Sequence, residues 1–218
     1  MSESTFQFKA QRPETGGPPV LVAVLAAGLS RRMGPKNKLL QEIDGAPMVR
    51  KVVEQALASL CERVVVVVGH EAQKVREALS GLSVQFVDNL EFQEGLAASV
   101  RAAASATQPH EALLVCLGDM PRVSATVLNQ LIHAYWQQPG KAAYQPGFKG
   151  KRGNPVLWAP AMVQGLGALQ GDEGARSLLN AHRDNVLEVP VHSDAIFMDI
   201  DTPQALRAAR GQEKFLRP

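Results

Sequence analysis

The sequence has few cysteines, few aromatic residues and almost no excess of charge of either sign. Its two cysteines, Cys61 and Cys116, are not spaced as a CxxC pair, and both lie in or beside apolar stretches. This placement favours small core residues of a protein from a reducing cytoplasm over a disulfide or a zinc site. A formal net charge of +2 gives no global field that would attract nucleic acid or an anionic membrane. Any anionic ligand must therefore be bound by a local site.

Long apolar runs are also absent. No stretch approaches the roughly eighteen apolar residues of a membrane-spanning helix. The N-terminus lacks the basic and then apolar regions of a secretory signal. We therefore expect a cytoplasmic protein with neither a membrane nor a nucleic-acid partner. Adjacent glycines and prolines predict a flexible leader over residues 1–19, followed by a single domain over 20–210 and a flexible tail over 211–218.

Short apolar runs alternate with helical patterns over the first two thirds of the chain. Runs at 19–28, 63–69, 84–89 and 111–119 have strand character, and amphipathic patterns occupy 47–59, 71–81, 95–106 and 124–138. This alternation predicts a three-layer α/β fold, with Rossmann-like βα units around a mostly parallel sheet.

The pattern changes beyond residue 138. Residues 142–158 predict a small β-hairpin excursion around a glycine-rich basic loop, and 186–191 and 195–200 predict short strands. A last helix is expected over 201–211, with Thr202 as N-cap and Pro203 in its first turn.

Gly28, Gly69 and Asp119 each follow a predicted parallel strand. They should share the sheet edge where ligands of such folds gather. The loop after the first strand, within "LAAGLSRRMGPKNKLL" (Leu25 to Leu40), carries several arginines and lysines. It matches neither the P-loop nor the GxGxxG motif. Glycine nevertheless lets a backbone approach an anion, and arginine and lysine bind phosphate oxygens. A phosphate site and a solvated surface turn both remain open on this pattern.

The same stretch resembles the signature LAAGxSxRMG…KLL of the MobA-like nucleotidyltransferases. These are single-domain α/β enzymes that join a nucleoside monophosphate to a phosphorylated partner. The resemblance implies that Arg32 and Lys38 are catalytic cations, whereas Arg31 and Lys36 fall at variable positions and are interpreted as surface charges. It also implies contacts to the nucleotide from Leu25, Ala26, Ala27 and Gly28.

A triphosphate normally comes with Mg²⁺, which prefers one or two carboxylates together with phosphate oxygens. In isolation Asp119 could equally be a turn residue or a helix cap. Its string "GDMP" is similar to the family's metal-binding position, which implies a catalytic role and a Mg²⁺ cofactor. Spacing alone does not choose between Asp199 and Asp201 as a second ligand. Similarity to the family's DIDTP stretch favours Asp201.

Further segments resemble parts of the family that surround the substrates. Gly95 and Ser99 match a segment that lies against the base and ribose, although Ser99 could also be an ordinary helix residue. "GKRGNPVLW" and "GDEGARSLL" resemble stretches of the molybdenum cofactor cytidylyltransferases. This implies that Arg152, Asn154 and Arg176 bind the acceptor, with asparagine where that pattern usually has histidine. Arg176 could alternatively pair with Asp172 or Glu173.

In this family LAAG accompanies cytidylyl transfer and LAGG guanylyl transfer. The methyl of Ala27 would narrow the base pocket and favour a pyrimidine, by about 1–3 kcal/mol. The resemblance thus implies transfer of CMP from CTP to the phosphate of Mo-molybdopterin, with release of pyrophosphate. It also implies transient contact with a molybdenum hydroxylase. Alternatives are GTP as donor, another phosphorylated metabolite as acceptor, or a non-catalytic cofactor carrier for a molybdenum hydroxylase.

Overall fold

The computed structural model describes residues 17–33, 36–170 and 175–211. Their middle layer is an eight-stranded sheet of order β10-β7-β9-β6-β1-β4-β5, with β8 paired to β7. A separate two-stranded sheet pairs β2 (Glu42–Ile43) with β3 (Ala46–Pro47). The strands of the main sheet are β1 (Val20–Ala26), β4 (Arg63–Val68), β5 (Gln85–Asp88), β6 (Ala112–Leu117), β7 (Ala143–Phe148), β8 (Lys151–Arg152), β9 (Val156–Trp158) and β10 (Val186–Pro190).

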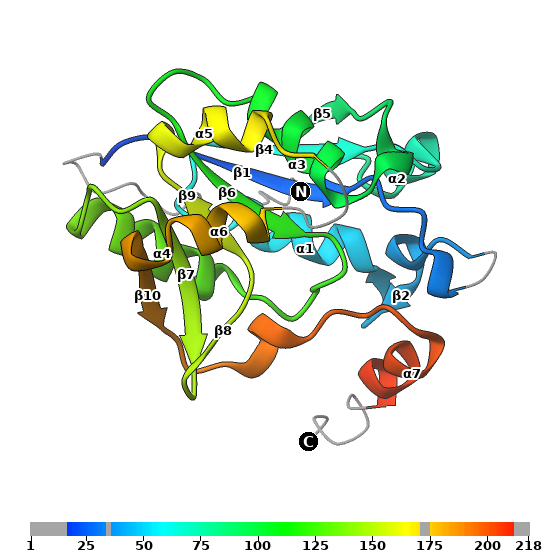
Figure 1. Ribbon diagram of the computed structural model, residues 1–218. Helices are drawn as coiled ribbons and strands as arrows, with labels where there is room; N and C mark the ends of the chain where they lie inside the picture. The colour runs from blue at the N-terminus through cyan, green and yellow to red at the C-terminus, as the bar shows by residue number, and fades with distance from the viewer. Residues whose placement is uncertain (1–16, 34–35, 171–174, 212–218) are drawn as a thin grey trace, which may run out of the picture.

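Helices cover both faces of this sheet (Figure 1). One face packs against α1 (Met48–Leu57), α2 (Ala72–Ala78) and α4 (Ala125–Gln137). The other packs against α3 (Leu96–Ser105), α5 (Pro160–Gly167) and α6 (Arg176–Ala181). The predicted three-layer α/β fold is therefore confirmed.

The central strands β1, β4 and β6 are parallel to one another and buried on both faces. Every residue of β1 is buried, and alternate side chains enter the cores above and below the sheet. Burial on both faces explains why these strands appear in the sequence as unbroken apolar runs. Leu25 pairs with Val67 on one side and with Leu117 on the other, so the three strands end at one edge.

The C-terminal half contains the predicted hairpin. β7 pairs antiparallel with both β8 and β9, and β9 pairs antiparallel with β6, which makes the sheet mixed. β10 then joins the outer edge parallel to β7. The last helix, α7 (Pro203–Gly211), begins as predicted, because Thr202 Oγ1 accepts a hydrogen bond from the Ala205 amide at 3.1 Å.

The predicted strand over 195–200 is wrong. The first half of this stretch lies in a short 3₁₀ helix, η5 (Asp194–Phe197), which begins where Ser193 Oγ accepts the Ala195 amide at 3.2 Å, and residues 198–200 form no strand. A serine that captures a backbone amide in this way competes with strand pairing. In Figure 1 the chain after η5 runs along the lower side of the molecule to α7.

The folded part of the chain begins before Val20. The Pro18 carbonyl accepts a hydrogen bond from Trp136 Nε1 at 3.0 Å, and the Pro19 carbonyl accepts one from the Ala112 amide at 2.9 Å. These bonds attach Pro18 and Pro19 to the domain, and the division of the chain into leader, domain and tail stays a prediction. Residues 1–16 and 212–218 lie outside the described residues, so their flexibility stays a prediction. Within the described ranges, no helix combines the length and apolar character needed to cross a bilayer.

Candidate active site

The ends of β1 and β6 approach each other closely at the edge where the sequence predicts a ligand. The Gly118 amide donates to the Leu25 carbonyl at 3.0 Å. A methyl group on Gly118 would lie 2.7 Å from that carbonyl oxygen, so this close approach requires glycine. Asp119 and the loop after β1 are thereby brought side by side.

The loop after β1 is held in shape by two buried polar residues. Ser30 has a left-handed backbone with φ of 53°, and its Oγ accepts the Lys38 amide at 3.1 Å. Asn37 Oδ1 accepts the Leu39 amide at 3.0 Å and caps the 3₁₀ helix η2 (Lys38–Leu40). Together they fix the backbone at Lys38. Our sequence interpretation gave neither residue a role, although Ser30 matches the serine of the family signature LAAGxSxRMG.

Charged side chains from three distant parts of the chain meet beside this loop. Lys38 Nζ donates to Asp119 Oδ2 at 2.5 Å and also to Asp201 Oδ1. Arg32, in the 3₁₀ helix η1 (Arg31–Met33), places Nη1 3.0 Å from Asp201 Oδ2. The Lys38, Asp119 and Asp201 side chains are only 14–19% exposed, whereas Arg32 is 74% exposed. The structure thus brings all the predicted catalytic and metal-binding side chains into one cluster, which we call the charge cluster.

Backbone and apolar contacts hold the charge cluster together. The Ile200 amide donates to the Asp119 carbonyl at 2.9 Å, which anchors the segment carrying Asp201. A small apolar core links that segment to η1, to α1 and to α7. Its buried members are Met33, Ile43, Met48, Ile200, Leu206 and Ala209.

The electrostatics of the charge cluster favour ionised Lys38 and Asp201. Burial by itself would lower the pKa of Lys38, but the charges and hydrogen bonds of Asp119 and Asp201 outweigh it, so this pKa is raised. Burial would raise the pKa of Asp201, but Lys38 outweighs it and the pKa is lowered. By contrast, partial burial and a hydrogen bond with Asp201 raise the pKa of Asp199. Asp201 is therefore the better anionic ligand of the two.

The donor set fits a hard divalent cation that is shared with a phosphate ligand. Asp119 Oδ1 is buried and has no hydrogen-bond partner, as expected of an oxygen shaped to accept an additional ligand. Carboxylate oxygens are ligands that Mg²⁺ prefers, and it commonly uses only one or two of them beside substrate phosphates. In the described part of the chain, no group of three or more His, Cys, Asp or Glu side chains could hold a metal by itself.

A cavity of about 870 Å³ begins at the ends of β1 and β6 and extends over β9 and β7. Leu25 and Leu117 line it at the ends of β1 and β6, and Leu96 lines it from the start of α3. Its apolar lining also includes Val100, Val115, Val156, Trp158, Leu179 and Val186. The cavity therefore reaches the strand ends from which the loop after β1 and Asp119 continue, and none of the four charge-cluster side chains is in its lining.

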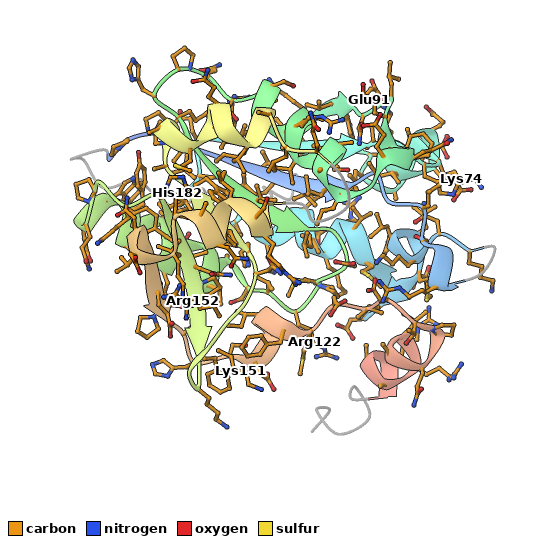
Figure 2. All side chains as sticks on the ribbon, viewed as in Figure 1. Lys74, Glu91, Arg122, Lys151, Arg152 and His182 are labelled. Atoms are coloured by element: carbon orange, nitrogen blue, oxygen red, sulfur yellow. The ribbon has the colours of Figure 1, made fainter. Side chains whose placement is uncertain are left out.

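All three predicted acceptor residues, Arg152, Asn154 and Arg176, line this cavity. Arg183 lines it as well and was missed, because no motif marks it. Figure 2 shows Arg152 on the β7–β8 hairpin, further from the tip than Lys151. Arg152 Nε pairs with Glu188 at 3.0 Å. The alternative partners of Arg176, Asp172 and Glu173, lie outside the described residues.

The predicted nucleotide contacts at Ala26 and Ala27 involve side chains that are both 1% exposed. A methyl group built on Gly69 would lie 2.9 Å from the Ala27 Cβ, so the Ala27 methyl packs toward the end of β4. The expectation that this methyl narrows an open base pocket is therefore wrong, because the methyl is buried beside Gly69 and borders no open space. Gly28, by contrast, is exposed with open space around it.

Gly95 and Ser99 lie on either side of the start of α3. Gly95 has φ of 96° and ψ of −159°, a conformation essentially restricted to glycine, and it precedes the first helical residue. Ser99 is 6% exposed, and its Oγ accepts a hydrogen bond from Asn89 Nδ2 at 3.2 Å. This bond supports the alternative that Ser99 is an interior helix residue, and its contact with a nucleotide stays a prediction.

Comparison with known proteins identifies a family over most of the chain. The model of the MobA-like NTP transferase domain matches residues 22–186. The bifunctional protein GlmU of Burkholderia thailandensis is 37% identical over 114 residues, which are 52% of this chain and 25% of GlmU. The chain thus spans about a quarter of the length of that curated relative.

Solved structures share the fold. A homologue of Mycobacterium tuberculosis Rv0371c from Mycobacterium sp. strain JC1 aligns with a TM-score of 0.79 at 24% identity, over 91% of this chain and 98% of that one. CMP:2-keto-3-deoxy-manno-octonic acid synthetase, complexed with CTP, aligns with a TM-score of 0.71 at 14% identity, over 91% of this chain and 99% of that one. Molybdopterin-guanine dinucleotide biosynthesis protein A of Archaeoglobus fulgidus aligns with a TM-score of 0.62 at 22% identity, over 90% of this chain and 100% of that one.

Removing the lysine of the charge cluster should destabilise the ligand-free protein. In Lys38→Met, Asp119 would lose its cation and Asp201 would keep only the exposed Arg32, so we expect the free energy of unfolding at pH 7 to fall by about 3 kcal/mol. Because folding lowers the pKa of Asp201 from 3.8, the wild type loses this contribution as pH falls below that value. Urea unfolding at several pH values should therefore show a difference between the two proteins that shrinks in acid.

Lys51→Met is the matched control. Lys51 Nζ lies 3.4 Å from Asp44 Oδ2 in a half-exposed pair outside the charge cluster. Its loss should change the free energy of unfolding by about 1 kcal/mol or less. Equal effects of the two substitutions, or a Lys38→Met effect that does not vary with pH, would contradict the description of the charge cluster.

Proposed function

Because the chain belongs to the MobA-like NTP transferase domain family, we propose that it is a cytidylyltransferase with a molybdopterin acceptor. It transfers CMP from CTP to the terminal phosphate of Mo-molybdopterin and releases pyrophosphate. The observation that carries the proposal is the charge cluster next to a cavity lined by Arg152, Arg176 and Arg183. This arrangement offers a polyanion site and an anionic acceptor site side by side.

The proposed reaction is a direct in-line displacement. An oxygen of the acceptor phosphate forms a bond to the α-phosphorus of CTP, and the bond from that phosphorus to the oxygen bridging to the β-phosphate breaks. The bonding electrons leave with pyrophosphate, so no protein nucleophile is needed. The chain contributes positioning and charge stabilisation, as is usual in phosphoryl transfer. Lys38 and the exposed Arg32 would donate to the phosphate oxygens on which charge develops.

The carboxylates serve a separate purpose in this proposal. Asp119 and Asp201 would hold Mg²⁺ together with phosphate oxygens, and the unpartnered Asp119 Oδ1 supports this assignment. When bound, Mg²⁺ neutralises phosphate charge and orients the triphosphate. The lowered pKa of Asp201 favours its anionic, metal-binding form.

The cavity is the proposed acceptor site. Its lining combines apolar side chains, among them Trp158, with arginines and amides, which suits a ring system that carries a phosphate. The structural neighbour named for molybdopterin-guanine dinucleotide biosynthesis supports an acceptor of this class. The neighbour complexed with CTP supports the proposed donor.

A transferase with a different donor or acceptor is the second candidate. The similarity to GlmU and to CMP:2-keto-3-deoxy-manno-octonic acid synthetase favours another small metabolite as acceptor. The structural similarity to molybdopterin-guanine dinucleotide biosynthesis protein A favours GTP as donor. Since the Ala27 methyl is buried, the preference for CTP depends on the LAAG pattern and on the CTP-bound neighbour alone.

The test is an assay of pyrophosphate release with CTP, GTP, ATP or UTP, each with Mo-molybdopterin and Mg²⁺. We expect turnover with CTP, and a loss of roughly 10²–10³-fold in Asp119→Asn, the size typical of losing a preorganised electrostatic group. Asp88→Asn should retain activity, because Asp88 ends the edge strand β5 and pairs with Arg76.

Three outcomes would overturn parts of this proposal. Faster turnover with GTP would contradict the assignment of CTP. Turnover only with a sugar phosphate or another metabolite would contradict the acceptor. Delivery of cofactor to a molybdenum hydroxylase that is unchanged in Asp119→Asn, without pyrophosphate release, would show a carrier rather than an enzyme.

Removal of the cavity arginines should weaken acceptor binding selectively. In Arg152→Ala and Arg176→Ala we expect KM for the acceptor to rise roughly 10- to 100-fold, the range for a lost hydrogen bond to a charged group. The affinity for CTP should stay within about twofold, since the arginines line the cavity rather than the charge cluster. Arg76→Ala, which removes an ion pair at the far edge of the sheet, is the control. A matching loss of CTP affinity would show that this cavity is not a separate acceptor site.

A further inference from the structure

The carboxylates of the charge cluster are already occupied by cations that belong to the chain. Lys38 Nζ donates to Asp119 Oδ2 at 2.5 Å and to Asp201 Oδ1, so its ammonium lies between the two side chains. Arg32 takes the second oxygen of Asp201 at 3.0 Å. Among the four carboxylate oxygens of these aspartates, Asp119 Oδ1 alone has no partner in the described residues.

A metal ion and the ammonium cannot share this position. Mg²⁺ lies about 2.0–2.1 Å from its oxygen ligands and dehydrates reluctantly. An ion bridging the two side chains could use the free Asp119 Oδ1, but on Asp201 it would need an oxygen that Lys38 or Arg32 now holds. It would then lie close to the ammonium, which is bonded to both carboxylates. Two cations at that separation, in a site with little solvent, repel each other strongly. Metal binding between these carboxylates therefore requires Lys38 to leave.

We propose that Lys38 is an internal counter-cation, which a divalent metal ion displaces only when a nucleoside triphosphate offers Lys38 a new partner. Metal binding to this pair of carboxylates is thereby made conditional on nucleotide. This inference rests on the proposed function, because the nucleoside triphosphate is the ligand that draws Lys38 away.

The exchange needs movement of one side chain only. The Lys38 backbone is fixed by its hydrogen bond to Ser30 Oγ at 3.1 Å and by the capped η2 turn. Its ammonium sits at the end of a flexible four-carbon stem with three donors. Lys38 lies on the same loop as Gly28 and Arg32, where the phosphates are expected. The ammonium thus has two alternative sets of anionic partners, the carboxylates and the phosphate oxygens, within reach of one backbone position.

Two consequences follow for binding. Nucleotide should strengthen metal binding, and by linkage metal should strengthen nucleotide binding by the same factor. Without nucleotide, the wild-type protein should bind divalent metal weakly, because the metal must break two charged hydrogen bonds of Lys38. A variant without the ammonium should have its carboxylates open to metal at all times.

The test is titration of the nucleotide-free protein with Mn²⁺, following free Mn²⁺ by electron paramagnetic resonance. Lys38→Met should bind Mn²⁺ about tenfold or more tightly than the wild type, within the range of coupling free energies between sites. Lys51→Met should bind as the wild type does, because its ion pair lies outside the charge cluster. Circular dichroism reports whether each variant is folded. If Lys38→Met is not folded, Lys38→Gln replaces it, because glutamine keeps an amide donor without the charge.

If the folded Lys38 variant binds Mn²⁺ no more tightly than the wild type, the proposal that Lys38 is an internal counter-cation is wrong. The readout does not depend on turnover, so it separates this inference from the proposed function. If Lys38→Met gains Mn²⁺ affinity while the wild type transfers no CMP, the counter-cation stands and the transferase proposal fails. If the wild type transfers CMP but the variant gains no Mn²⁺ affinity, the transferase proposal stands and the counter-cation proposal fails.

Discussion

The pairing of Lys38 with Asp119 and Asp201 is the interaction on which the site depends. The partners lie 81 and 163 residues from Lys38 in the sequence, and each comes from a different structural unit. Parallel pairing of β1 with β6 brings the first two together, and the Ile200 amide bound to the Asp119 carbonyl brings the third. Charges that are largely withdrawn from water need partners, and in this fold the three side chains are counter-ions of one another.

The surrounding architecture keeps these groups fixed while leaving space beside them. The small core around Met33 and Ile200 ties the loop after β1 to the segment before α7. On the other side, the cavity extends from Leu25 and Leu117 over the antiparallel half of the sheet. The charge cluster and the cavity, which are the proposed phosphate and acceptor sites, are thus placed on neighbouring parts of one sheet. Transfer between two bound substrates requires such an arrangement.

The order of the central strands and helices could be predicted from the sequence, because strands buried on both faces are continuous apolar runs. The start of α7 could be predicted as well, because Thr202 and Pro203 mark a helix start. The strand expected at 195–200 failed, since a short alternating run does not reveal that Ser193 caps a 3₁₀ turn. The direction of the Ala27 methyl depends on the register of β1 against β4, which composition does not encode. The hydrogen bonds of Ser30 and Asn37, and the place of Arg183 in the cavity lining, arise only on folding.

The most direct measurement of the central claim is a crystal structure of the protein with a non-hydrolysable CTP analogue and Mg²⁺. The account predicts a metal ion held by Asp119 and Asp201, with Lys38 Nζ moved from the carboxylates to a phosphate oxygen. Triphosphate bound away from the loop of Gly28 and Arg32, or a metal ion that contacts neither carboxylate, would contradict it.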